Sequence, residues 1–97
     1  MITQKVDEGL ISKAKALVDG ATNIVITAHV SPDGDAVGST LAMCHYLKSL
    51  GKNATVVLPT AFPAFFKWLE GAREVIIFKD NRRAAVNAIN QADLIIA

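Results

Sequence analysis

The sequence predicts an α/β fold in which a parallel β-sheet is sandwiched between helices. Four short apolar runs are rich in β-branched residues, which is typical of fully buried strands, and helical patterns alternate with them. The runs cover residues 23–28, 54–58, 74–78 and 93–97. This order is Rossmann-like. Since 97 residues suffice for one small domain, we expect a single domain over residues 1–97.

The two longer helical patterns lie in the first half of the chain. Residues 3–19 place apolar side chains at helical spacing, and Gly20 is suited to cap the C-terminus of that helix. Residues 35–50 form a second pattern, which Gly51 closes. The first strand therefore lies between these two helices in the sequence.

The second half predicts two shorter helices. One covers residues 62–71, with Pro63 suited to its first turn, and the other covers residues 81–90. The last apolar run stops at Ala97 without a turn signal or a polar exit. We therefore expect the fold to be incomplete at its C-terminus, as in a fragment of a longer protein.

Composition limits the classes of function. Ten basic and nine acidic residues give a net charge of +1, so bulk charge does not attract long nucleic acid or an anionic membrane. No apolar run approaches the roughly 18 to 20 residues that span a bilayer. The N-terminus lacks the apolar core of a signal peptide, and the single cysteine, Cys44, cannot form an internal disulfide. These features predict a cytoplasmic protein.

The segment ITAHVSPDGDAVGS, residues 26–39, holds the candidate functional residues. His29 follows the first strand, Asp33 lies in the loop, and Asp35 starts the next helix. Ligands of parallel sheets bind at the carboxyl ends of strands, so we expect the three side chains to converge there. One imidazole and two carboxylates suit Mn, Fe or Zn, with Mg²⁺ less favoured. The helix N-terminus behind Asp35 also favours phosphate.

Other interpretations of this loop remain open from the residues alone. The sequence PDG is ordinary turn chemistry, and Ser31, Asp33 or Asp35 could cap the helix. The loop could also hold a nucleotide or phosphate without turnover. Asp33 and Asp35 further resemble the aspartate pair of haloacid dehalogenase-like phosphatases, but there the first aspartate follows the strand directly. Here four residues separate His29 from Asp33, which disfavours that interpretation.

The segment resembles the first motif of the DHH phosphoesterase family, in the branch that degrades short oligoribonucleotides and 3′-phosphoadenosine 5′-phosphate. The first helix, the helix after VGS, the segment FFKWLEG and the strand ADLIIA occur in a similar order, so the resemblance covers essentially the whole chain. It implies that His29 and Asp33 bind one Mn²⁺ and that Asp35 binds a second. The two ions would activate a water for in-line attack on phosphorus, which makes Asp35 the candidate catalytic residue. Mg²⁺ or another divalent ion is the alternative cofactor.

The resemblance also implies the partners. The substrate would be a short single-stranded oligoribonucleotide or a small phosphorylated nucleotide, with no role for long duplexes or membranes, and the longer protein could be a homodimer. Related DHH-like chains hydrolyse cyclic dinucleotides, pyrophosphate, polyphosphate or single-stranded DNA. The motif holds metal and not substrate, so it does not choose among them.

Parts of the family pattern lie outside these 97 residues. A further metal-binding aspartate, the Asp-His-His motif and a substrate-binding domain would all follow Ala97. We therefore expect the 97-residue chain alone to be inactive and to bind metal weakly. We also expect Ala97 to lie at the same edge of the sheet as His29, because the missing aspartate would enter the site there.

Some other residues carry weaker expectations. We expect the aromatic residues of the third helical segment to lie in the core or at a domain interface, and Cys44 and His45 to serve helix packing or to lie at the surface. Gly38 should mark a close approach of its helix to the sheet or to phosphate. The aromatic residues are Phe62, Phe65, Phe66 and Trp68.

Overall fold

The computed structural model describes residues 7–30 and 34–97, and its centre is a four-stranded parallel sheet. The strand order is β3-β2-β1-β4, so the first strand along the chain lies inside the sheet. The α/β fold with a parallel sheet is therefore confirmed. The strands are β1 (Asn23–Ile26), β2 (Asn53–Leu58), β3 (Ile76–Ile77) and β4 (Leu94–Ile96).

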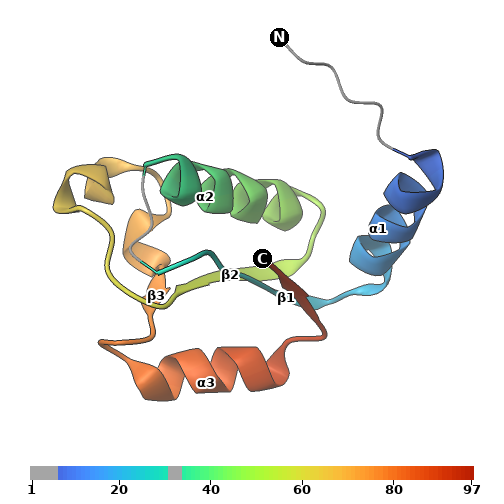
Figure 1. Ribbon diagram of the computed structural model, residues 1–97. Coiled ribbons are helices and arrows are strands. Elements are labelled where there is room, and N and C mark those ends of the chain that lie inside the picture. Colours follow the sequence, from blue (N-terminus) through green and yellow to red (C-terminus); the bar gives the residue numbers. More distant parts are fainter. Residues whose placement is uncertain (1–6, 31–33) are drawn as a thin grey trace, which may run out of the picture.

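Helices cover both faces of this sheet. The helix α2 (Gly34–Ser49) lies over one face and α3 (Arg82–Gln91) over the other (Figure 1). Two short 3₁₀ helices, η1 (Ala64–Trp68) and η2 (Ala72–Glu74), connect β2 to β3. No helix in the described part of the chain is long and apolar enough to cross a membrane.

The alternation of side chains along the strands divides the core in two. Ile24 and Ile26 of β1 point to the α2 face, whereas Val25 points to the α3 face, where it meets Ala85. All three β1 residues are at most 3% exposed. This two-sided burial explains why the strand sequence is an uninterrupted apolar run. On the α2 face the cluster also contains Val37, Leu41, Leu47, Ala54, Val56 and Leu58.

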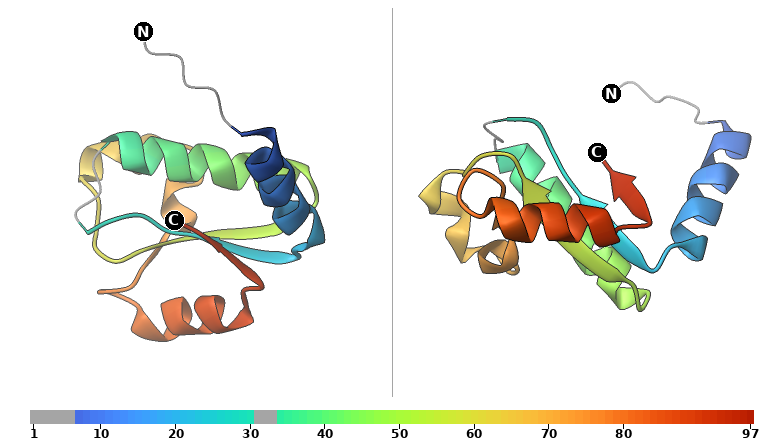
Figure 2. Two further views of the ribbon diagram at one scale, coloured as in Figure 1. Left: turned by 45° about the vertical axis from the view of Figure 1, so that its right-hand side comes forward. Right: turned by 90° about the horizontal axis from the view of Figure 1, so that it is seen from below.

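The helix α1 (Glu8–Gly20) stands apart beside the β4 edge (Figures 1 and 2). None of its residues is buried, and Val18 is the residue that packs on the core cluster. A hollow of about 680 Å³, lined mainly by apolar side chains, separates it from α2 and β4. Hydrogen bonds nevertheless cap both ends of α1. The Asp7 carboxylate accepts from the Gly9 N–H at 2.7 Å, and Lys52 Nζ donates to the Asp19 carbonyl at 2.8 Å.

The two predicted glycine stops have different outcomes. Gly51 has φ = +81°; its N–H donates to the Lys48 carbonyl and the Lys52 N–H to the Leu47 carbonyl, so the predicted stop of α2 is confirmed. Gly20 is not a cap, because α1 includes it and Ala21 takes the C-cap position with φ = −90°. The chain leaves α1 directly in an extended conformation toward β1, which requires no left-handed residue.

Two other elements differ from prediction. The helix expected over residues 62–71 is the shorter η1, whose i→i+3 hydrogen bonds start at the Pro63 carbonyl, so Pro63 precedes the helix and is not in its first turn. The strand expected over residues 74–78 is only β3, because Glu74 belongs to η2 and Phe78 starts a turn. As an edge strand, β3 pairs with β2 alone, which limits its length.

Polar side chains hold the amino-terminal edge of the sheet together. The Asp93 carboxylate accepts from the Thr22 and Asn23 N–H groups at 2.8 and 2.9 Å, and the Asn53 amide donates to Asn23 Oδ1 at 3.0 Å. The hydrogen bonds from Thr22 and, secondarily, Asn23 hold the pKa of the Asp93 carboxyl below its usual range. The starts of β4, β1 and β2 are thus linked by side chains as well as by the ladder.

Truncating Leu47 should test the α2 face of the core. Leu47 is fully buried, so Leu47→Ala is expected to lower the free energy of unfolding in urea by about 2–5 kcal/mol. The matched control is Leu50→Ala in the turn directly after the helix, where the side chain is 46% exposed and the expected loss is below about 1 kcal/mol. Equal losses for both variants would contradict this packing.

Replacing Asp93 should change how stability depends on pH. Because the pKa of Asp93 is lower in the folded than in the unfolded state, its contribution is present above the unfolded pKa and is lost as pH falls through the folded pKa. Asp93→Asn should therefore lower Tm at neutral pH, and its difference from the wild type should shrink below about pH 4. Asp80→Asn, at an exposed turn acid, serves as the control. A difference in Tm that does not vary with pH would refute the role of the charge.

Candidate functional site

The strand order places a topological switch point between β1 and β4. From β1 the chain moves outward through β2 to β3, and α3 then returns it to β4 on the other side of β1. Such a point opens a crevice at the carboxyl ends of the two strands, where ligands of α/β folds bind. The Thr27 N–H donates to the Ile96 carbonyl at 2.9 Å, so the residues after β1 lie beside Ala97. The prediction that Ala97 shares this edge with His29 is confirmed.

His29 lies three residues beyond β1 and is exposed. Its Nδ1 is 2.9 Å from the Val30 carbonyl oxygen. Since a carbonyl oxygen only accepts, Nδ1 must carry the proton, and the neutral ring then presents a lone pair at Nε2. Metal-binding histidines typically donate their second ring N–H to a backbone carbonyl in this way, so His29 fits a metal ligand.

The N-terminus of α2 supplies the second predicted ligand. Asp35 is the second residue of the helix, after Gly34, and is exposed. The neighbouring Ala36 lines the same hollow as His29 and Ala97, so Asp35 lies at the same edge of the sheet. Asp33 and Ser31 lie outside the described residues, so their predicted roles as ligand or cap stay predictions.

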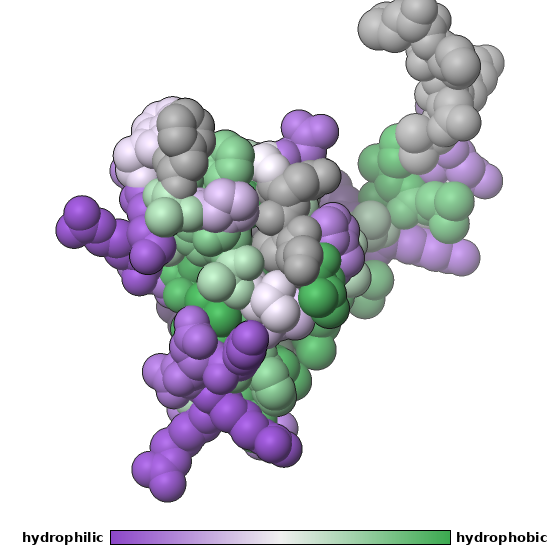
Figure 3. Space-filling view, turned by 60° about the vertical axis from the view of Figure 1, so that its left-hand side comes forward, coloured by the Kyte–Doolittle hydropathy of each residue, from purple (hydrophilic) through white to green (hydrophobic). Residues whose placement is uncertain are grey.

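A hollow of about 580 Å³ lies where β1, β4 and α2 meet at this edge. Its walls are mainly apolar, from Ile26 and Ile96 of the strands to Met43 of α2. Thr40 also lines it, but its hydroxyl donates to the Val37 carbonyl at 3.0 Å and is therefore already satisfied. Figure 3 views this side of the molecule, where hydrophilic residues gather over the start of α3; residues 79–83 are all exposed there.

The described residues do not by themselves complete a metal cage. Across residues 7–30 and 34–97, no three His, Cys, Asp or Glu side chains lie close enough together to hold a metal ion. His29 and Asp35 contribute an imidazole nitrogen and carboxylate oxygens, a donor set that suits Mn²⁺ and related ions.

The expected closeness of Gly38 to the sheet is wrong, since an added Cβ there would meet no atom within 4 Å.

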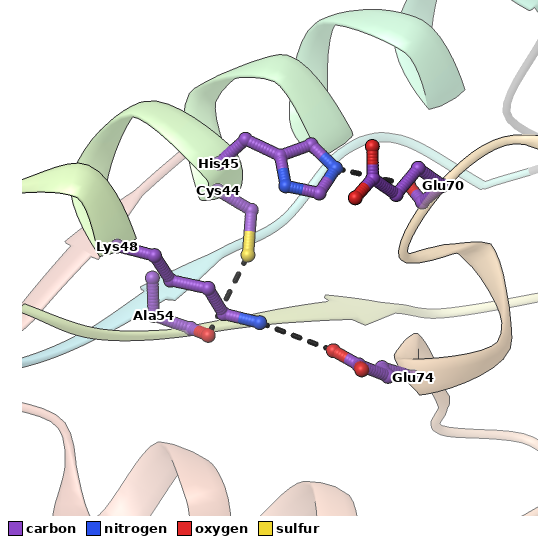
Figure 4. A network of polar contacts seen from close by, with 6 residues as sticks. All are labelled: Cys44, His45, Lys48, Ala54, Glu70 and Glu74. Atoms are coloured by element: carbon purple, nitrogen blue, oxygen red, sulfur yellow. Dashed lines mark hydrogen bonds and ion pairs between the residues drawn. The ribbon is translucent and has the colours of Figure 1, made fainter.

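Other reactive side chains of α2 make structural contacts (Figure 4). Burial raises the pKa of the Cys44 thiol, which donates to the Ala54 carbonyl at 3.5 Å. The His45 Nε2–H donates to the Glu70 carbonyl at 3.0 Å, and Lys48 pairs with Glu74 at 3.1 Å. The hydrogen bond that Lys48 Nζ donates to the Glu74 carboxylate raises the pKa of Lys48. No pattern in the sequence indicates that α2 and residues 70–74 lie side by side.

Comparison with known proteins identifies one family and two relatives. Residues 23–97 match the DHH family, N-terminal domain. The chain is 40% identical over 65 residues to a bifunctional oligoribonuclease and PAP phosphatase, NrnA, from Thermus thermophilus. It is 37% identical to an exopolyphosphatase-related protein from Bacteroides fragilis, whose crystal structure matches with a TM-score of 0.90 over 97% of this chain.

Both relatives are much longer than these 97 residues. The match to the Thermus protein covers 67% of this chain but 19% of that protein, and the match to the Bacteroides structure covers 28% of that chain. The likeness therefore concerns one part of each relative.

The two histidines of the chain should show opposite tautomers. His29 faces a carbonyl oxygen with Nδ1 and His45 faces one with Nε2, so each should carry its proton at that nitrogen. Long-range ¹H–¹⁵N NMR in alkaline solution, where imidazole is neutral, distinguishes the two forms. His45 is the internal control. Observation of His29 in the Nε2–H form would remove the argument that Nε2 is open to a metal.

Proposed function

The chain belongs to the DHH family through its N-terminal domain, and we propose that it forms the metal-binding part of a phosphoesterase. The observation that carries this proposal is the position of His29 and Asp35 at the switch point between β1 and β4. The hydrogen bond from His29 Nδ1 to the Val30 carbonyl supports it further, because it leaves Nε2 available.

In this proposal His29 and Asp33 hold one divalent ion and Asp35 holds a second. Mn²⁺ fits the mixed nitrogen and oxygen donors, and Mg²⁺ or another divalent ion is the alternative. When bound, the ions supply Lewis-acid stabilisation of the phosphoryl oxygens and activation of a water. The N-terminus of α2 adds backbone N–H groups and partial positive charge, which favour a phosphate beside Asp35.

The proposed substrates are short oligoribonucleotides and 3′-phosphoadenosine 5′-phosphate. The likeness to the Thermus protein supports this choice, since the name of that protein contains both activities. Polyphosphate is a second candidate, because the Bacteroides structure is described as exopolyphosphatase-related and matches nearly the whole chain.

Hydrolysis assays on the natural full-length protein test the proposal. With Mn²⁺ present, His29→Ala and Asp35→Asn should each lower turnover of a diribonucleotide or 3′-phosphoadenosine 5′-phosphate at least about a hundredfold, because loss of even an indirect metal contact typically costs 10- to 100-fold. Asp80→Asn, which removes an exposed acid from a turn, should leave turnover unchanged.

The same assay separates the alternatives. Turnover of polyphosphate but not of the nucleotides would favour the second candidate. Turnover that is unaffected by a metal chelator, or by both site substitutions, would contradict the metal-dependent mechanism. Binding of the nucleotides without hydrolysis would indicate a binding module.

A further inference from the structure

The segment that follows β2 contacts α2 along most of the length of that helix. Phe66 of η1 meets Gly34 at the start of α2, and in the last third of the helix the Glu70 carbonyl accepts from His45 and Glu74 pairs with Lys48. Figure 4 shows the second and third of these contacts. The first contact lies directly beside the candidate site, since Gly34 is bonded to Asp35.

Phe66 and Gly34 are so close that a Cβ at position 34 would require the Phe66 ring to shift. A Cβ at Gly34 would lie 2.9 Å from Phe66 Cζ and 3.3 Å from Cε1. Gly34 is not among the glycines with positive φ, which in the described chain are Gly51 and Gly71. A larger residue at position 34 is therefore opposed by the Phe66 ring and not by the backbone conformation.

Phe66 is itself held in place. Its side chain is half-buried and packs against the core cluster on the α2 face of the sheet. Gly71, at φ = +84°, brings the end of the same segment close to α2, since a Cβ there would lie 3.4 Å from the His45 ring. The aromatic ring is thus a fixed surface against which the first turn of α2 rests.

We propose that Phe66 is a positioning residue for the metal site: its ring fixes Gly34 and thereby the backbone that carries Asp35. This inference rests on the proposed function, because it assumes that Asp35 binds metal. A carboxylate ligand must be held to within a fraction of an ångström, and the contacts behind it supply that precision. Phe66 does not touch the metal or the substrate in this account.

The test measures the Mn²⁺ affinity of the natural full-length protein by water-proton relaxation, well below the unfolding temperature of each variant. Phe66→Leu keeps an apolar side chain on the core but does not reach Gly34, and it should weaken Mn²⁺ binding roughly tenfold with little change in Tm. Trp68→Ala is the matched control, because this aromatic residue of the same 3₁₀ helix is 72% exposed; its affinity should equal that of the wild type. Asp35→Asn is the control for the site itself.

A second arm tests the contact without metal. Gly34→Ala should lower Tm in the wild type, where the new Cβ meets the ring, and should be tolerated in a Phe66→Ala background, where alanine favours the helix. Additive effects of the two substitutions would overturn the contact.

The outcomes distinguish the inference from the proposed function. If Asp35→Asn weakens Mn²⁺ binding but Phe66→Leu binds Mn²⁺ like the wild type, the positioning role is wrong and the metal site stands. If Asp35→Asn binds Mn²⁺ as tightly as the wild type, the proposed site is wrong and the positioning role falls with it. A loss of Tm in Phe66→Leu with unchanged affinity would assign Phe66 to the core alone.

Discussion

The complete enclosure of β1 is the constraint on which the rest of the structure depends. Both of its edges are paired, with β2 and with β4, and both of its faces are covered, by α2 and by α3. A strand in that position can expose its residues only at its ends. The loop that leaves its carboxyl end is therefore the first place where this part of the chain can present polar side chains to a ligand, and His29 stands there.

Much of the fold follows from local patterns. Uninterrupted β-branched runs predict strands that are buried on both faces, which holds for β1 and β2. Gly51 ends α2, where its left-handed conformation accompanies hydrogen bonds from the Gly51 and Lys52 N–H groups to the last carbonyls. The predictions at residues 62–71 and 74–78 were too long. Apolar side chains in these segments pack on the core although much of their backbone is neither α-helix nor strand. Their composition therefore resembles that of a longer helix and a longer strand, but the hydrogen-bond pattern of those elements is absent from most of their length.

The candidate site, like the fold, has a part that the sequence predicts and a part that only the structure shows. The positions of His29 and Asp35 after a strand were sufficient to predict the edge of the sheet at which they lie, because that depends on topology alone. The sequence could not reveal that Phe66 reaches Gly34 or that His45 donates to Glu70, since these contacts join residues more than twenty positions apart. The glycine at position 34 looked like ordinary turn chemistry, and only the ring beside it gives the steric reason.

The pairing of the first strand with the last also governs how the chain acquires its structure. Asn23 and Asp93, which share a hydrogen bond, are 70 residues apart in the sequence. During synthesis β1 can pair with β2 early, but its other edge stays open until the residues of β4 have left the ribosome. An open edge on so apolar a strand invites pairing with other chains, and contacts of such long range form slowly. Until β4 arrives, the unpaired edge of β1 is therefore a place where another chain can add a strand.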